Sequence, residues 1–382
     1  MKEGEISVSK SKHISISITE RCNLNCIYCF EKSKLNKKME LETAKSIIDY
    51  ELLNSSEYES LTVDFMGGEP FLEFDLIKGV CEYYWNLDLE KPIFFYTTTN
   101  GTLVKERVKD WLTANKARFV CALSLDGDRI SHDINRCDSF DRIDVNFFRE
   151  MWPAQKVKTI VSSKTLEMLY DNVVFLHQKG FPQIEIKLAY GFDWSDTSIC
   201  KMFAEQLQML ILFYEKNPNL VPCSFLNVKL ADILLPNENI KKWCNAGVRT
   251  VSYDMDGNRY PCRYFQDLRK NNKLDLNEMW EINYHTIQDT LEVPCKDCLI
   301  RNICRTCYAQ NYEVNSSFGK KPLLSCRVSR EMAYATAELY MLRCRHIEDE
   351  PIDDRMFKAS RMIENAYKSN RWALGGFDGE ID

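Results

Sequence analysis

Directly after a strand-like run, residues 19–30 of this 382-residue chain read TERCNLNCIYCF. Three cysteines in it, Cys22, Cys26 and Cys29, have the spacing CxxxCxxC. Thiolates are natural ligands of iron–sulfur clusters, and four of them saturate a four-iron cluster. A cluster held by three cysteines leaves one iron open to a substrate or cofactor. The alternatives are a zinc site or three unrelated thiols, but zinc usually takes a fourth Cys or His at short range, and no His follows nearby.

The composition narrows the class of protein. The length allows one large domain and a smaller one. A net charge of −6 and a pI near 5.6 do not support nucleic acid as a main partner. We expect no membrane span and no signal peptide, because residues 1–12 are polar and no apolar run reaches about 20 residues. Sixteen cysteines then favour metal ligation in a reducing cytoplasm over disulfides.

The first half of the chain alternates short β-branched or aromatic runs with longer helical patterns, which predicts βα units and a parallel sheet. Six strands are expected, at residues 13–19, 61–66, 93–99, 118–125, 156–162 and 183–189. In such a fold the functional side chains gather at the carboxyl ends of the strands.

The second expected strand ends in a glycine motif, MGGEP, at residues 66–70. Gly67 and Gly68 let the backbone approach a ligand, and Glu69 offers a carboxylate to a cationic amine. An ordinary strand-to-helix turn is the alternative. Behind CxxxCxxC and Tyr28, however, the motif resembles the GGEP motif of the radical S-adenosylmethionine (radical SAM) superfamily.

The resemblance implies a partial (β/α)6 TIM-type barrel. In that family the open iron of a [4Fe–4S] cluster chelates the amino and carboxylate groups of S-adenosylmethionine. Reduction then releases a 5′-deoxyadenosyl radical, so the hard chemistry belongs to the cofactor. Gly67, Gly68 and Glu69 would hold the amino group, with Tyr28 beside the cofactor.

Further polar residues stand where later strands are expected to end. Asn100 and Ser124 match family positions near the sugar and methionine parts of the cofactor. Arg136, in an HDxxR-like stretch, can meet the cofactor's carboxylate by a bidentate contact. A turn hydroxyl or amide, or a surface ion pair, remains the alternative for each. Cys137 follows at the expected rim, where a thiol could donate a hydrogen atom to a substrate radical.

The alternating pattern breaks between residues 216 and 227, so we expect a barrel over residues 1–216 and a second domain over residues 217–382. Seven cysteines stand in the second domain, with zinc ribbons as the alternative interpretation. Their order resembles the SPASM extension of peptide-modifying radical SAM enzymes, which binds two auxiliary four-iron clusters. The seven are Cys244, Cys262, Cys295, Cys298, Cys304, Cys307 and Cys326.

By the resemblance, Cys244, Cys262 and Cys307 hold the first auxiliary cluster, and Cys295, Cys298, Cys304 and Cys326 hold the second. The chain departs from the family pattern once, because two residues rather than three separate Cys304 from Cys307. The first cluster lacks a fourth ligand, since Glu238 stands where sulfatase maturases place a cysteine. Either Cys223 supplies it or an iron stays open. Two helices are expected after the cysteines, at residues 328–345 and 353–368.

Three clusters suit an overall two-electron oxidation. The resemblance therefore implies a maturase that cross-links a ribosomally made precursor peptide by a thioether, ether or carbon–carbon bond. An anaerobic sulfatase maturase that makes formylglycine is the first alternative, although that family's Asp after the cysteine matching Cys262 is replaced by Arg263. A peptide epimerase, an electron carrier and a zinc-stabilised binding module are others. A flavodoxin or ferredoxin is the expected electron donor. A separate peptide-recognition protein is an optional partner, because only about a dozen residues precede the first strand.

Overall fold

In the structure, a computed structural model, the chain forms two compact units. It describes residues 11–29, 31, 36–190, 194, 196–236, 242, 244–345 and 353–373. The first unit comprises Met1–Leu125, Arg136–Val157 and Asn245–Tyr284, and the second comprises Asp126–Asn135, Lys158–Cys244 and His285–Asp382. The expected boundary at residue 216 is not one of the limits of these units, and the two expected domains stay a prediction.

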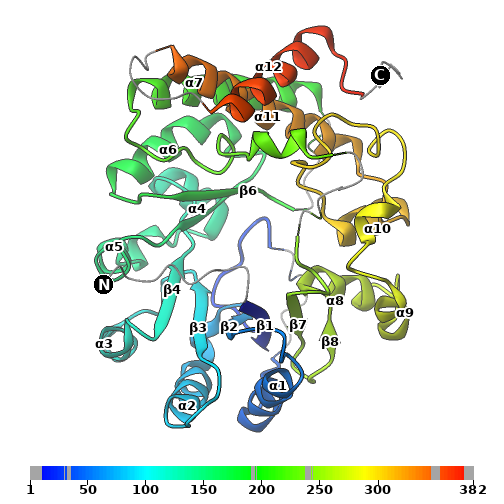
Figure 1. Ribbon diagram of the computed structural model, residues 1–382. Helices are drawn as coiled ribbons and strands as arrows, with labels where there is room; N and C mark the ends of the chain where they lie inside the picture. Colours follow the sequence, from blue (N-terminus) through cyan, green and yellow to red (C-terminus); the bar gives the residue numbers. More distant parts are fainter. Residues whose placement is uncertain are drawn as a thin grey trace. The chain divides into compact units, whose positions relative to one another are not determined.

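The first unit is built on a six-stranded sheet with the order β4-β3-β2-β1-β7-β8 (Figure 1). All neighbours pair in parallel except β7 and β8, which are antiparallel. The strands are β1 (Ser11–Thr19), β2 (Ser60–Gly67), β3 (Ile93–Thr99), β4 (Phe119–Leu123), β7 (Thr250–Tyr253) and β8 (Arg259–Tyr260). The first four expected strands are thereby confirmed.

Alternating and aromatic side chains explain why these segments form a buried sheet. Ile14, Ile16 and Ile18 of β1 are all fully buried. Phe65 of β2 stacks on Phe95 of β3, with ring centroids 5.8 Å apart. Parallel strands buried on both faces favour such apolar and aromatic runs.

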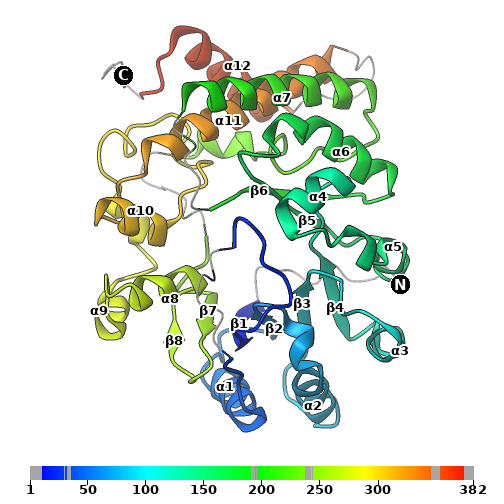
Figure 2. The same cartoon turned by 180° about the vertical axis from the view of Figure 1, so that it is seen from behind.

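Helices follow the strands of the first unit and cover the sheet (Figures 1 and 2). They are α1 (Leu41–Leu53), α2 (Phe74–Trp85), α3 (Glu106–Asn115), α5 (Val145–Met151), α8 (Arg263–Lys270) and α9 (Leu276–Glu281), with 3-10 turns η2 (Pro70–Glu73) and η3 (Phe140–Arg142). Trp111 of α3 packs edge-on against Phe119 of β4, with centroids 5.1 Å apart. The helices therefore close the apolar side of the sheet and leave its carboxyl edge to the loops.

The second unit holds a two-stranded sheet, β5 (Val157–Val161) with β6 (Ile184–Leu188), and a set of helices. The helices are α4 (Arg129–Arg136, whose last residue belongs to the first unit), α6 (Leu169–Gln178), α7 (Thr197–Lys216), α10 (Tyr308–Asn315), α11 (Leu323–Cys344) and α12 (Asp354–Ser369), with η4 (Leu166–Met168), η5 (Leu230–Leu234) and η6 (Ile287–Thr290). The last two expected strands and both expected C-terminal helices are confirmed, although α11 begins five residues before its expected start. Figures 1 and 2 both show α7, α11 and α12 side by side.

An apolar cluster joins the C-terminal helices to the cysteine-rich segment of the second unit. Leu299, Ile300 and Ile303 lie between successive cysteines and pack in one core with Ala337 of α11 and Ile363 of α12. Small residues on α11 let the segment approach the helix closely. The C-terminal helices therefore act as the platform on which the cysteine segment is folded.

The α/β fold class with a parallel sheet is confirmed. Two of the six expected strands form a sheet of their own, and β7 adds a parallel neighbour to β1 that the sequence pattern does not indicate. Within the described residues, none of the helices has the length and apolar character needed to cross a membrane.

Candidate metal centres

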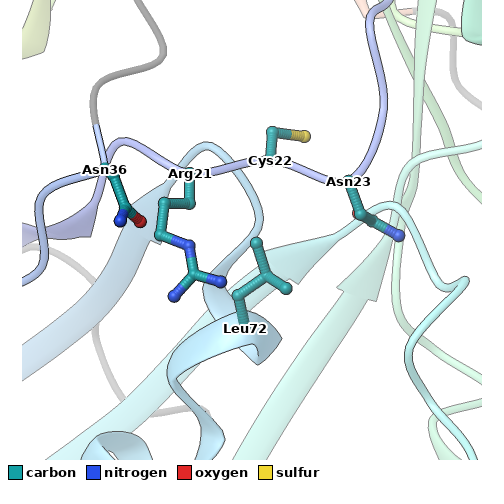
Figure 3. Close-up of a pocket in the computed structure, with 5 residues that line it drawn as sticks. All are labelled: Arg21, Cys22, Asn23, Asn36 and Leu72. Carbon is teal, nitrogen blue, oxygen red and sulfur yellow. The ribbon is translucent and has the colours of Figure 1, made fainter.

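The loop that carries Cys22, Cys26 and Cys29 leaves the carboxyl end of β1. All three thiols are partly exposed. A turn brings the Cys29 N–H to the Cys26 carbonyl at 3.1 Å. The Cys22 side chain leaves the backbone on the side opposite Arg21 (Figure 3), and both line a pocket of about 310 Å³. Asn23, Asn36 and Leu72 complete that pocket.

Gly67 and Gly68 fit against this cysteine loop so closely that no side chain has room. A Cβ on Gly68 would lie 2.2 Å from the Arg21 carbonyl oxygen, and one on Gly67 would lie 2.5 Å from the Thr19 carbonyl oxygen. The backbone N–H groups of Gly68 and Glu69 donate to those two loop carbonyls, at 3.0 and 2.9 Å. The two glycines therefore seat the loop on the end of β2, a role that sequence reasoning gave only in part.

Glu69 is the buried carboxylate of this edge, with 1% of its surface exposed. Its Oε1 accepts from Thr99 Oγ1 at 2.6 Å, and its Oε2 accepts from the Asn100 N–H at 2.9 Å. Burial raises the pKa of Glu69, and these hydrogen bonds together with the Arg136 charge oppose that rise. A fixed, buried carboxylate suits the ammonium group that the resemblance assigns to it.

Asn100 is held within the protein rather than left open toward a ligand. Its Nδ2 donates to Asn23 Oδ1 at 2.9 Å, and its Oδ1 accepts from the Thr102 hydroxyl at 2.7 Å. Asn23 donates in turn to that hydroxyl, at 2.7 Å. Asn23 lies between Cys22 and Cys26, so this amide network fixes the cysteine loop on the end of β3. Sequence reasoning did not identify Asn23 or Thr102.

Arg136, Tyr28 and Ser124 complete the residues predicted to surround a cofactor. The Arg136 guanidinium is buried and lies 5.4 Å from the centroid of the Tyr28 ring. Ser124 is half-buried, and its N–H donates to the Thr99 carbonyl at 2.9 Å. Their cofactor contacts stay predictions.

Cys137 is exposed, and its thiol donates to the Asn25 carbonyl of the cysteine loop at 2.9 Å. Its backbone is left-handed, with φ of 56°. The thiol thus lies beside the loop of the first cluster, as its expected place at the rim requires. A hydrogen-donor role stays a prediction.

A buried ion-pair network, missed by sequence reasoning, follows Cys29. Glu31 pairs with Arg263 and, at 3.5 Å, with the Lys270 ammonium. Lys270 also pairs with Glu20 at 3.0 Å. Glu31 and Arg263 directly follow the segments of Cys29 and Cys262, so one ion pair ties together the two segments that carry candidate ligands. The pairing spans more than two hundred residues, which is why no local pattern could reveal it.

The four cysteines assigned to the second auxiliary cluster line one cavity. Cys295, Cys298, Cys304 and Cys326 share it with three cationic side chains, Arg301, Lys321 and Arg330. Four thiols converging on one cavity have the donor chemistry of a [4Fe–4S] cluster. Among the described residues, no three Cys, His, Asp or Glu side chains come close enough to hold a single ion. A four-iron cluster binds each thiolate to a different iron, and this ligation stays a prediction.

The four thiols differ in electrostatic setting. Burial raises the pKa of Cys298 to about 12 and also raises that of Cys295. Burial acts in the same direction on Cys304, but the Lys321 ammonium and its hydrogen bond outweigh it, so the pKa of Cys304 lies below its ordinary value. One thiolate of the set is therefore stabilised by the protein itself.

The candidate first auxiliary set is less complete. Burial raises the pKa of Cys307, and the charge of Cys244 adds to that rise. Cys262 belongs to the first unit and directly precedes α8. Cys223 is fully buried, and burial raises its pKa to about 11. Glu238 lies outside the described residues.

Comparison with known proteins identifies the fold and the family. Residues 16–196, which include CxxxCxxC and GGEP, match the family model of the radical SAM superfamily. The chain contains a radical SAM domain. The matched range covers the cysteine loop, Glu69, Asn100 and Arg136, so the radical SAM domain contains the whole edge described above.

Curated relatives of known sequence align with the chain. An uncharacterised protein of Methanocaldococcus jannaschii is 31% identical over 191 residues, which span 47% of this chain and 64% of the relative. A cysteine-type anaerobic sulfatase-maturating enzyme of Clostridium perfringens is 25% identical over 330 residues, or 75% of this chain and 86% of the relative. The second alignment extends well beyond the radical SAM domain.

Solved structures share the fold. Native anSMEcpe with bound AdoMet superposes with a TM-score of 0.68 at 22% identity, covering 88% of this chain and 100% of that one. Streptococcus suis SuiB bound to its precursor peptide SuiA gives a TM-score of 0.57 at 17% identity, covering 82% of this chain and 75% of that one. The chain therefore has the fold of these two proteins over most of its length.

Proposed function

We propose that this radical SAM enzyme is a maturase that oxidises a ribosomally made precursor peptide by two electrons and closes a cross-link in it. The observation that carries the proposal is the second set of four thiols in a single cavity, distinct from the CxxxCxxC loop. A radical SAM site alone generates a radical, whereas an oxidised product also requires an electron acceptor. A further iron–sulfur cluster can be that acceptor.

In this proposal the cofactor set is S-adenosylmethionine, one [4Fe–4S] cluster on Cys22, Cys26 and Cys29, and two auxiliary clusters. S-adenosylmethionine, bound at Glu69 and Arg136, would supply the radical that removes one hydrogen atom from the peptide. The peptide would then lose one proton and one electron as the new bond forms, and an oxidised auxiliary cluster would accept that electron. A flavodoxin or ferredoxin supplies the electron that starts each turnover. The balance is one S-adenosylmethionine consumed for each pair of hydrogens removed.

The protein's own residues bind, orient and shield. Glu69 presents a buried carboxylate to the cofactor's ammonium group, and Arg136 offers a cation to its carboxylate. Gly67, Gly68 and the Asn100 network hold the cysteine loop in one place. Such preorganisation keeps a reactive radical close to a single hydrogen atom.

A peptide as the substrate is supported by the kind of proteins that share this fold and sequence. The Clostridium perfringens relative matures a sulfatase, and SuiB was solved with its precursor peptide. A separate peptide-recognition protein is an optional further partner. The first auxiliary cluster is proposed to keep an open iron rather than to take the fully buried Cys223 as its fourth ligand.

A formylglycine-forming sulfatase maturase is the second candidate, favoured by the alignment over 330 residues. Against it stands the residue after Cys262, which is Arg263 in a buried pair with Glu31. Neither residue is an uncommitted base at that place. This pairing is the reason for preferring the cross-linking reaction.

The test is the accurate mass of a candidate precursor peptide, encoded beside the gene, after anaerobic co-expression with the enzyme. We expect a loss of two hydrogens per modification and blocked fragmentation between two residues. The matched control is the triple variant of Cys22, Cys26 and Cys29 to Ala, which should leave the mass unchanged. An inverted stereocentre at unchanged mass would favour epimerisation. An unmodified peptide, with a sulfatase-type Cys or Ser converted to an aldehyde, would refute the proposal.

A further inference from the structure

Three cationic side chains line the same cavity as the thiols of Cys295, Cys298, Cys304 and Cys326. Arg301, Lys321 and Arg330 all line it. A four-iron cluster with four thiolates is an anion, so cations on the lining favour its presence and, above all, its reduced form. Lys321 is bonded directly to one of the four thiols.

Lys321 is 7% exposed, which is unusual for a lysine. Its ammonium donates to the Cys304 sulfur at 2.9 Å and to the Ser329 hydroxyl at 2.8 Å. A buried ammonium group thus contacts one of the four candidate ligands directly.

A buried ammonium group is costly unless a negative partner compensates it. Among the described residues, the Lys321 ammonium meets a sulfur and a hydroxyl and no carboxylate. The negative charge that keeps it inside must therefore come from the thiolates. The surroundings of Lys321 therefore suit a negatively charged iron–sulfur centre better than an ion pair with a carboxylate.

We propose that Lys321 is a positioning residue that sets the reduction potential of the second auxiliary cluster through Cys304. This inference rests on the proposed function, because it requires the cluster. A hydrogen bond to a ligand sulfur and a nearby positive charge both stabilise the reduced cluster, which raises its potential. A higher potential makes this cluster the favoured acceptor of the electron that the peptide gives up as the new bond forms.

The test compares Lys321→Met with Lys320→Met in chains whose Cys22, Cys26 and Cys29 are changed to Ala. Lys320 is the exposed neighbour on the same segment and serves as the matched control. Each protein is reconstituted anaerobically, its iron is counted, and its clusters are titrated with a graded reductant under EPR. Cys304→Ser identifies which signal belongs to the second auxiliary cluster.

We expect Lys321→Met to lower the equilibrium constant for reducing that cluster at least tenfold, a 59 mV shift for one electron. Lys320→Met should leave it unchanged. Lys321→Arg should keep most of the potential, and Lys321→Gln should lose most of it. The Arg and Gln variants also decide the question where the Met variant does not hold its cluster.

A wild-type reduction potential in Lys321→Met would overturn the inference and leave the proposed function intact. Where Lys321→Met does not hold its cluster, a wild-type potential in Lys321→Gln would overturn the inference in the same way. A background chain that binds no iron would instead refute the auxiliary clusters and, with them, the proposed function. Separate measurements therefore distinguish the two failures: the iron content tests the proposed function, and the reduction potential tests the inference about Lys321.

Discussion

Gly68 is the residue at which the fold and the candidate chemistry depend most directly on each other. It needs no unusual φ, so the absence of a side chain serves the close approach of the cysteine loop. That close approach lets two backbone hydrogen bonds fix the loop that carries all three cysteines of the motif. The site is thus held by backbone contacts that the GGEP motif alone makes possible.

Gly68→Ala should disturb that loop, because its Cβ would meet the Arg21 carbonyl. We expect a loss of about 2 kcal/mol in the free energy of unfolding, as for other overpacked sites, and a lower iron content after reconstitution. Urea unfolding of the apoprotein and an iron assay measure the two effects. Gly79→Ala is the control, since its Cβ would meet Leu41 at an ordinary 3.5 Å, and Ala in helix α2 gains up to about 1 kcal/mol. Equal behaviour of the two variants would contradict this role of Gly68.

The Glu31–Arg263 pair makes a second prediction at this scale. Arg263→Met leaves the Glu31 carboxylate buried, with the Lys270 ammonium beside it at 3.5 Å. Breaking a buried pair from one side costs about 3 kcal/mol, and removing both charges costs less. A double-mutant cycle with Glu31→Gln in the apoprotein should therefore show a coupling above about 1 kcal/mol. Additive single effects would mean that the pair does not join the two segments.

The sequence predicted some secondary-structure elements better than others. The six strands at the front of the chain were predictable because β-branched and aromatic runs recur at βα spacing, each ending in small or polar residues. The β7–β8 hairpin was not, because TVSY and RY are short and lie among cysteines whose spacing dominates the pattern. The early start of α11 was missed because residues 323–327 carry no helical apolar repeat, and Cys326 was considered only as a candidate cluster ligand.

A pH dependence is expected at the contact of α6 with α7. His177 Nε2 lies 2.9 Å from the Tyr214 hydroxyl, and burial lowers the pKa of this histidine. The unfolded chain therefore binds the proton more readily than the folded one. The contribution of His177 to stability is therefore fully present above the pKa of this histidine in the unfolded chain, about 6.5, and it is lost as the pH drops below that value. Urea unfolding of the apoprotein between pH 7.5 and 5.5 should show this slope, and His177→Gln should flatten it; an unchanged slope would assign it to other groups.

At the scale of the whole molecule, the candidate ligands divide into sets that the sequence predicted with unequal success. The resemblance to the SPASM extension grouped Cys295, Cys298, Cys304 and Cys326, and the structure places all four on one cavity. Lys321, which bonds to that set, was not foreseen, because a lysine in a polar segment carries no signal of burial. The grouping of Cys244, Cys262 and Cys307 stays a prediction, since it rests on the family pattern.

The chemistry proposed for the whole molecule is a two-electron oxidation of a peptide, and its stoichiometry tests it most directly. The measurement is anaerobic turnover of the purified enzyme on a precursor peptide deuterated at the reacting carbon, with mass analysis of both products. We predict one deuterium in each 5′-deoxyadenosine formed and one peptide lighter by one deuterium and one hydrogen for each S-adenosylmethionine cleaved. Deuterated 5′-deoxyadenosine beside a peptide that has regained a solvent hydrogen, with no new bond, would contradict the claim.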